Sequence, residues 1–261
     1  MQVNFHTHTA RCHHAKGTDR EYVEAAIASG FSVLGFADHS PYWFPSDYYS
    51  GHRMRPGKET EDYVRSVLSL KEEYKNDITI YLGFEAEYYP LYFEKFLELI
   101  EPYPYDYLIL GQHFIHNEIG GQHVCKTPER ENPDGLADYV SECIEGMKTG
   151  RFFYIAHPDV FTFRGDPAFY ETQMRKLCVA AKECGMPLEF NMLGFRNHRA
   201  YPYPPFWKIA AEVGNETLIG WDAHTPSMLD VPEAVEEART FLREQGLRIV
   251  EPTTPIKRRF F

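Results

Sequence analysis

The segment VNFHTHTARCHH, residues 3–14, joins a short β-prone run to four histidines within nine positions. The apolar run ends where His6 and His8 begin, and His13 and His14 follow shortly afterwards. An isolated H-x-H pair is more often two surface residues than a metal site. The residues that follow the other predicted strands therefore decide between these two interpretations.

Short apolar runs of this kind recur along the chain and alternate with longer segments of helical periodicity. Thr18 followed by Glu21 is typical of a capping box before the first helix, and Gly30 can end that helix. The alternation predicts an α/β fold in which crossover helices join parallel strands. We expect strands at residues 3–5, 33–37, 78–84, 107–110, 153–156, 187–190 and 217–221, with a possible eighth at 248–250. We expect helices at residues 20–29, 58–75, 91–100, 135–148, 168–185, 205–213 and 232–246.

Polar side chains follow nearly every predicted strand. In a closed parallel barrel all carboxyl ends of the strands lie on one face, so these side chains would converge there. Each one alone has a structural explanation, such as a capping aspartate or a half-buried histidine, but their joint placement favours a metal site. These residues are His6 and His8, Asp38 and His39, Glu85 and Glu87, Gln112 and His113, His157 and Asp159, Asn191, and Asp222 and His224.

The types of side chain in this set indicate which metals they would bind. Imidazole nitrogen and carboxylate oxygen are ligands that zinc, manganese and iron(II) accept, and one glutamate can bridge two ions. The candidates outnumber the ligands of a single ion, because a catalytic ion typically takes three or four protein ligands. The sequence therefore predicts two or three divalent transition-metal ions.

Length, charge and cysteine content exclude several other classes of protein. The 261 residues, 43% of them hydrophobic, suffice for a sizeable core, and no repeat or linker divides residues 1–261, so we expect one domain. A net charge of −11 disfavours nucleic acid and anionic membranes, and the basic run 257–259 is too short to change this. No apolar run approaches the ~18 residues that span a bilayer, and the five cysteines form no C-x-x-C pair. We expect a cytoplasmic protein.

The chain resembles the polymerase and histidinol phosphatase (PHP) superfamily, and within it the histidinol-phosphate phosphatase branch. The resemblance rests on HTHTARCHH, GFADHS, LGFEAEY, LGQHFI, IAHPD, LEFN and WDAH, which follow one another along almost the whole chain. It implies a distorted (β/α)7 barrel, similar to a TIM barrel, with three divalent ions (Zn, Mn or Fe) at the carboxyl ends of the strands.

Three ligand sets are implied by this resemblance, and Glu85 would bridge the first ion and the third. His14 is preferred over His13 because the family's third histidine falls six residues after the second histidine of H-x-H. Cys12 is interpreted as a packing residue, and Glu87 as either a support for the site or a solvated acid. The first set is His6, His8, Glu85 and Asp222; the second is His14, His39 and His224; the third is Glu85, His113 and His157.

The reaction implied by the resemblance is hydrolysis of L-histidinol phosphate to L-histidinol and phosphate, a step of histidine biosynthesis. A metal-bridging hydroxide would attack the phosphorus directly, with Glu85, Asp222 and His224 as catalytic residues. Arg164 and Arg196 follow predicted strands, and a guanidinium can bind phosphate through two parallel hydrogen bonds, so both are expected to contact the substrate. The partner would be a small phosphate ester, with the oligomeric state undetermined.

Several alternatives remain open from the sequence. Another PHP-type phosphoesterase with a different small substrate, an amidohydrolase-like metal hydrolase and a non-catalytic metal-binding protein would all use a similar set of residues. The aromatic segment after His39 is either a packed loop or a wall of the substrate site. Its aromatic residues are Tyr42, Trp43, Phe44, Tyr48 and Tyr49.

Overall fold

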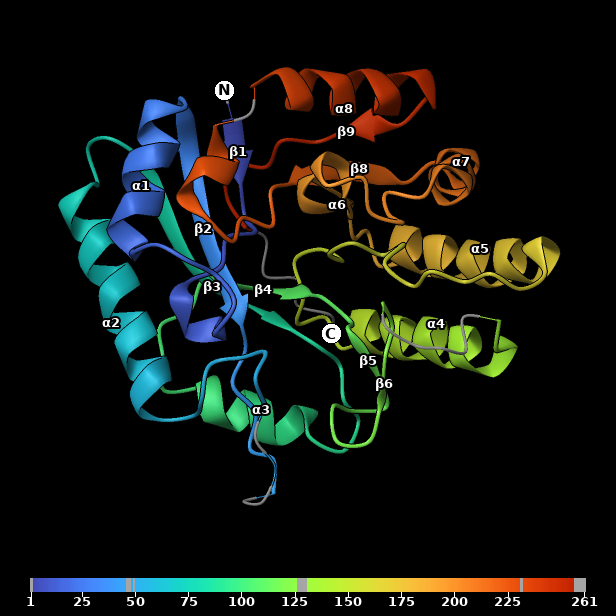
Figure 1. The fold of residues 1–261 in the computed structure, drawn as a ribbon, viewed down its shortest axis with the longest axis horizontal. Coiled ribbons are helices and arrows are strands. Elements are labelled where there is room, and N and C mark those ends of the chain that lie inside the picture. Colours follow the sequence, from blue (N-terminus) through green and yellow to red (C-terminus); the bar gives the residue numbers. More distant parts are fainter. Residues whose placement is uncertain (1, 46–47, 49, 126–130, 231, 256–261) are drawn as a thin grey trace.

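The computed structural model describes residues 2–45, 48, 50–125, 131–230 and 232–255. Its strands form a parallel barrel surrounded by helices (Figure 1). Two runs of parallel strands make up most of the barrel wall. The first run is β1 (Gln2–Asn4), β2 (Phe31–His39), β3 (Thr79–Ala86) and β4 (Tyr107–Leu110); the second is β7 (Leu188–Asn191), β8 (Glu216–Gly220) and β9 (Arg248–Ile249).

Two junctions join these runs into a ring. Ile155 pairs in parallel with Leu110 of β4 and with Leu188 of β7, and Thr7 pairs with Ala223 just beyond β8. Six strands (β1, β2, β3, β4, β7 and β8) and the segment at Ile155 thus give seven positions around the barrel. The predicted distorted (β/α)7 barrel is confirmed. The predicted strand 153–156 is reduced to an isolated bridge, although Phe153 and Ala156 still donate backbone hydrogen bonds to β4.

All seven predicted helices are present, with ends within a few residues of those expected. The capping box of α1 forms as predicted, because the Thr18 side chain accepts from Glu21 N and the Glu21 side chain accepts from Thr18 N. In Figure 1, α1 and α2 lie on one side of the strands, and α4, α5 and α7 on the other. The helices are α1 (Asp19–Ala28), α2 (Lys58–Glu73), α3 (Phe93–Ile100), α4 (Pro133–Lys148), α5 (Pro167–Glu183), α7 (Pro204–Val213) and α8 (Pro232–Glu244).

Some short elements were not predicted. A two-stranded antiparallel hairpin, β5 (Phe114–Ile115) and β6 (Gln122–His123), follows β4, and the short helix α6 (Met192–Arg196) follows β7. Two single-turn 3₁₀ helices, η1 (Ala10–Cys12) and η2 (Pro226–Leu229), lie in the loops after β1 and β8. These segments are too short to show a hydrophobic period. Asn191 starts α6, since its side chain accepts from Gly194 N.

The interior of the barrel is filled with side chains. Phe5, Tyr107 and Phe153 pack edge to face, and Tyr107 Oη donates to the carbonyls of Phe5 and Phe36. A larger apolar core lies between the strands and the helices. Because the interior is packed, the space for a ligand lies at the carboxyl end of the barrel. No helix within the described residues combines the length and apolar character that spanning a membrane requires.

Candidate metal centre

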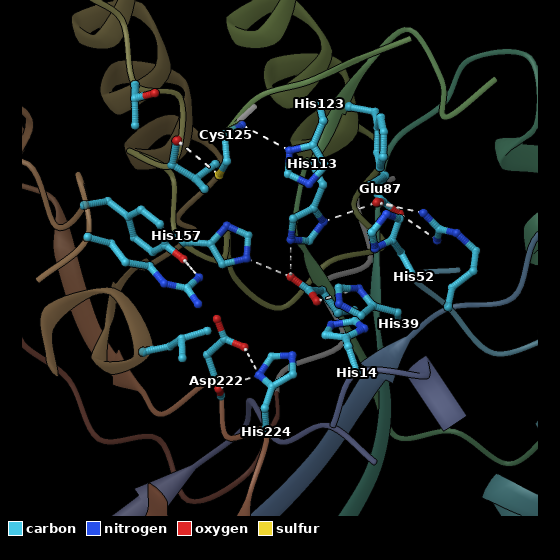
Figure 2. A pocket seen from close by; sticks show the side chains of 18 of the residues that line it. His14, His39, His52, Glu87, His113, His123, Cys125, His157, Asp222 and His224 are labelled. Carbon is cyan, nitrogen blue, oxygen red and sulfur yellow. Dashed lines mark hydrogen bonds and ion pairs between the residues drawn. The ribbon is translucent and has the colours of Figure 1, made fainter. Parts of the chain in front are cut away.

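A cavity of about 820 Å³ opens at the carboxyl ends of the barrel strands (Figure 2). His6 and His8 are fully buried beneath it, at the end of β1. The structure therefore brings all nine sequence-predicted metal ligands to one end of the barrel. The other seven line the cavity: His14, His39, Glu85, His113, His157, Asp222 and His224.

The side chains of the first expected ligand set converge tightly. His8 Nε2 lies 3.0 Å from Asp222 Oδ1 and 3.1 Å from His6 Nε2. His6 Nε2 is 3.6 Å from both Glu85 Oε1 and Asp222 Oδ1. His6, His8 and Asp222 each offer a ligand atom, and these atoms all lie within 4.8 Å of one another, which is close enough for them to share one ion.

The second expected set forms a neighbouring group of histidines. The ring centroid of His14 is 4.8 Å from that of His224 and 5.2 Å from that of His39. His8 is also close, at 4.1 Å from His224 and 4.5 Å from His39. His8 thus lies between the first two sets rather than in the first alone.

Glu85 lies at the centre of the whole arrangement. Its Oε1 is 2.8 Å from His157 Nε2 and 3.5 Å from His113 Nε2, while its Oε2 is 3.0 Å from His39 Nδ1. A Cβ at Gly111, directly after β4, would overlap this carboxylate, so the glycine makes room for it. Glu85 is therefore the carboxylate that could bridge ions from different sets.

Oxygen atoms around the site orient five of the seven histidines in the same way. In each ring Nδ1 faces an oxygen, which leaves Nε2 directed elsewhere as a potential ligand atom. Two rings differ. Nδ1 of His39 faces an oxygen of Glu85, which is itself an expected metal ligand, and Nδ1 of His157 has no hydrogen-bond partner in the described structure. The five pairs are His6 with Glu189 (2.8 Å), His8 with Asp38 (3.3 Å), His113 with Glu87 (3.2 Å), His14 with the Cys12 carbonyl (2.8 Å) and His224 with the Asp222 carbonyl (3.0 Å).

The charged groups of the site are compatible with bound cations. Burial strongly disfavours the charged form of His6, yet the carboxylates of Glu189, Asp222 and Glu85 together raise its pKa to about 10. Burial likewise opposes ionisation of Glu85 and Asp222, but the surrounding histidines hold the pKa of both carboxyls well below their usual range. Glu85 Oε2 is also buried without a hydrogen bond to any described group. Buried carboxylates and imidazole nitrogens with an orphaned oxygen fit a set of divalent cations.

Two of these residues hold an unusual backbone conformation. His157 has φ 31° and Asp222 has φ 49°, in the left-handed region that residues other than glycine seldom adopt. Asp222 lies two residues after β8 and His157 two residues after the bridge at Ile155, and both turn their side chains into the cavity (Figure 2). Such strain is retained where it aims a functional group.

The structure separates the neighbouring residues His13 and His14. His14 lines the cavity, whereas His13 caps η1 in the left-handed conformation with Nε2 3.5 Å from Glu59 on α2. Cys12 is fully buried, with Sγ 3.1 Å from the Thr9 carbonyl, and burial raises the pKa of its thiol. Its Sγ also lies near enough to His14 and His224 to share an ion with them.

Glu87 is not the solvated acid that one interpretation allowed. It is buried and forms two hydrogen bonds of 2.9 Å with Arg53, which in turn contacts Glu118 at 2.7 Å. Burial favours the neutral carboxyl, but Arg53 and His113 lower the pKa of Glu87 to about 2. Glu87 therefore supports His113 as a charged carboxylate.

The two arginines expected to bind phosphate do not line this cavity. Arg164 lines a separate cavity of about 710 Å³ beside Tyr203, and Arg196 lines a third, of about 490 Å³. Arg196 is the last residue of α6, and that helix directs its guanidinium to the Met228 carbonyl, 3.4 Å away. Arg199, three residues further along, lines both the main cavity and the cavity of Arg196, and it donates to Tyr201 Oη at 3.0 Å.

The aromatic segment after His39 packs against the protein rather than around the cavity. Tyr42 is buried, stacks on Phe96 and donates to the Glu87 carbonyl; Tyr48 Oη lies 3.0 Å from Glu118. Trp43 is 57% exposed and lies outside the cavity lining, and Tyr49 is outside the described residues. The same segment does supply His52 and Arg53 to the cavity (Figure 2), which no strand-end pattern could indicate.

Comparisons with known proteins agree with this geometry. The PHP domain family model matches residues 4–193. A protein of Deinococcus radiodurans named "Probable histidinol-phosphatase" is 32% identical over 245 residues, covering 90% of this chain and 91% of that protein. One of Schizosaccharomyces pombe with the same name is 25% identical, covering 95% of this chain and 88% of that protein.

A crystal structure gives the same fold. It is histidinol phosphate phosphatase from Lactococcus lactis, complexed with zinc, L-histidinol and phosphate, and it superposes with a TM-score of 0.75 at 19% identity over 99% of both chains. At 19% identity, this superposition is evidence for a shared fold alone. The family model and the Deinococcus relative, together with the ring of histidines and carboxylates, show that the chain belongs to the PHP domain family.

Proposed function

We propose that this protein is a metal-dependent phosphomonoesterase that hydrolyses L-histidinol phosphate to L-histidinol and phosphate. The observation that carries the proposal is the convergence of seven histidines, Glu85 and Asp222 at the carboxyl end of one barrel. Relatives that match nearly the whole chain are named histidinol-phosphatase, which supports this substrate over other phosphate esters.

The nine side chains would hold three divalent ions, with zinc, manganese or iron as the candidates. We assign Glu85 as the bridging ligand because its two oxygens face histidines of different sets. The close approach of His8 to His39 and His224 allows it to contribute to the second ion as well as to the first. The sets are His6, His8, Glu85 and Asp222; His14, His39 and His224; and Glu85, His113 and His157.

The ions would supply charge neutralisation for the phosphate and lower the pKa of water from 15.7 towards about 7. The residues of the chain hold five of the seven histidines in place through the oxygens that face their Nδ1 atoms. Asp222 stays a charged carboxylate between His6 and His8, so it can contribute negative charge to the first ion.

We assign the phosphate contact to Arg199, in place of the two arginines expected from the sequence. Its position on the cavity wall beside Tyr201 supports this role, and its guanidinium can donate two parallel hydrogen bonds to phosphate oxygens. Arg53 is less suitable because Glu87, Glu118 and the Ser40 carbonyl already occupy its donors.

The shape of the cavity favours a small substrate. A volume of about 820 Å³ suits a molecule of the size of histidinol phosphate. The net charge of −11 disfavours long nucleic acids, which other phosphoesterases hydrolyse. Phe114, Val160 and Leu193 give the cavity an apolar wall that can accommodate the organic part of the ester.

The test is phosphate release by metal-reconstituted protein from histidinol phosphate, measured beside a panel of other phosphomonoesters and amide or amine substrates. We expect histidinol phosphate to be hydrolysed with the highest kcat/KM of the panel. A higher kcat/KM for another phosphomonoester would support the proposed reaction, phosphomonoester hydrolysis, but would show that histidinol phosphate is not the preferred substrate. Release of ammonia or amine without phosphate would favour an amidohydrolase-type enzyme instead.

A further inference from the structure

Glu189, in the middle of β7, is fully buried directly behind the metal centre. Four donors surround its carboxylate. Oε1 accepts from His6 Nδ1 at 2.8 Å and from Tyr154 Oη at 3.3 Å. Oε2 accepts from His157 N and from Asn191 Nδ2, both at 3.0 Å. Both oxygens are thus fully used as acceptors, and two of their donors belong to residues assigned as metal ligands.

The space for Glu189 is built into the neighbouring strand. A Cβ at Gly220 of β8 would overlap Oε1 of Glu189, so glycine at this position admits the carboxylate. Within the described part of the chain, the ion-pair partner of Glu189 is His6 alone, with no lysine or arginine beside it. A buried carboxylate without a fixed counter-charge is costly. The presence of such a carboxylate here points to a role in the metal centre, which Glu189 would play through its contact with the imidazole of His6.

We propose that Glu189 is a positioning residue that fixes the tautomer of His6, so that Nδ1 carries the proton and Nε2 presents its lone pair to a metal ion. The proposal rests on the metal centre of the proposed function. His6 Nε2 faces the cluster, 3.1 Å from His8 Nε2 and 3.6 Å from Asp222 Oδ1. A carboxylate on the far nitrogen of a ligating histidine fixes the orientation of the ring and raises its basicity.

The surrounding hydrogen bonds make the proposal specific to a carboxylate. Asn191 has a fixed orientation, because its Oδ1 accepts from Gly194 N at 2.9 Å while Nδ2 donates to Glu189 and to Asp222. A glutamine at position 189 must therefore turn its oxygen towards Asn191 and the His157 N–H, both of which are donors. Its amide NH₂ then faces His6, whose Nδ1 has to accept and whose Nε2 has to carry the proton. A protonated Nε2 cannot bind metal.

The chain offers a matched control in Glu142 of α4. This buried carboxylate also accepts from the Nδ1 of a histidine, His116, at 2.9 Å, and from a backbone N–H, that of His116, at 2.8 Å. Its other oxygen accepts from Gln112 Nε2 at 3.2 Å, a contact that a glutamine at position 142 can keep through its amide oxygen or lose without changing the charge of any histidine. His116 is exposed and lies outside the metal centre. E142Q therefore makes the same chemical change, at a histidine that is not a ligand.

The experiment compares zinc affinity, by competition with a chelator, in wild type, E189Q, E189D and E142Q, together with long-range ¹H–¹⁵N spectra of the zinc-loaded proteins. We expect E189Q to fold but to bind zinc about 10- to 100-fold more weakly, the effect typical of lost outer-shell partners. In E189Q, the ¹⁵N chemical shifts of one imidazole should change, because its proton moves from Nδ1 to Nε2; these shifts are its imidazole signature. E142Q should match wild type in zinc affinity and in these spectra. E189D keeps the charge but is one methylene shorter, so its affinity should lie in between.

Wild-type zinc affinity and an unchanged imidazole signature in E189Q would overturn the inference. If E189Q does not fold, wild-type zinc affinity in E189D would overturn it instead. These outcomes differ from a failure of the proposed function, which would appear in the unmodified protein as absent zinc binding or absent hydrolysis of histidinol phosphate.

Discussion

Glu85 and His157 are 72 positions apart in the chain, yet Oε1 of Glu85 lies 2.8 Å from Nε2 of His157. The contact joins β3 to the turn after Ile155, across the mouth of the barrel. Oε2 of the same carboxylate faces His39, so Glu85 contacts ligands from several strands at once. Glu85 therefore faces histidines of all three expected ligand sets.

The first prediction concerns the charge of Glu85. Glu85→Gln keeps the shape of the side chain but removes the bridging carboxylate, so bound zinc should fall by at least one ion per chain. Activity should fall by more than about 100-fold, since even outer-shell changes cost 10- to 100-fold in metal affinity. Elemental analysis measures the zinc content, and phosphate release from histidinol phosphate on the same sample measures the activity. Full zinc content in Glu85→Gln would show that Glu85 is not a ligand.

The second prediction separates two adjacent histidines. His14→Ala should lose metal and most activity because His14 lines the cavity beside His39 and His224. His13→Ala should retain both, because His13 points to Glu59 on α2. The pair is its own control, since the two changes are chemically identical. Equal losses of metal in both variants would contradict the assignment.

The third prediction concerns the arginines. Arg199→Ala should lower kcat/KM for histidinol phosphate by about 10- to 100-fold, because loss of a hydrogen bond to a charged group costs roughly 1.5 to 3 kcal/mol. Metal content should stay unchanged. Lysine at this position should restore activity only in part, since it keeps the charge without the planar fork.

Arg164→Ala and Arg196→Ala are the comparison variants for Arg199. Both arginines line other cavities, so near wild-type kcat/KM is expected in each. If instead these two variants lose activity with metal retained, while Arg199→Ala does not, the phosphate contact belongs to the arginines expected from the sequence.

The fourth prediction is a pH dependence of stability caused by Asp159. Burial raises the pKa of Asp159 from 3.8 to about 6 in the folded protein, where its Oδ2 accepts from Tyr203 N and Trp207 Nε1. The folded state then binds more protons than the unfolded state between these two values, so this group lowers the free energy of unfolding as pH rises through them.

Asp159→Asn keeps the acceptor oxygen and removes the titration. From about pH 4 to about pH 7, its free energy of unfolding should rise relative to wild type by on the order of 2 to 3 kcal/mol. Denaturant unfolding of both proteins at each pH measures this difference. A difference that is constant across the range would show that Asp159 does not titrate as described.

The sequence was sufficient to place the expected ligands at one end of the barrel, because most of them lie at or shortly after the carboxyl ends of parallel strands, which share one face. Asp222 and His224, for example, come two and four residues after β8. His14 lies beyond η1 and was instead indicated by the family resemblance. The arginines could not be placed in this way, since the direction of a loop side chain depends on local turns such as α6. Glu189 could not be identified either, because both faces of a barrel strand are buried and the sequence does not indicate which face carries the site.

The most direct test of the three-ion phosphatase centre is stepwise zinc reconstitution of metal-free protein, with zinc per chain and hydrolysis of histidinol phosphate measured on each sample. Activity should rise as the zinc content approaches three ions per chain, and phosphate and histidinol should appear in equal amounts. Full activity at one ion per chain, or no hydrolysis of histidinol phosphate at any zinc content, would contradict the three-ion phosphatase centre.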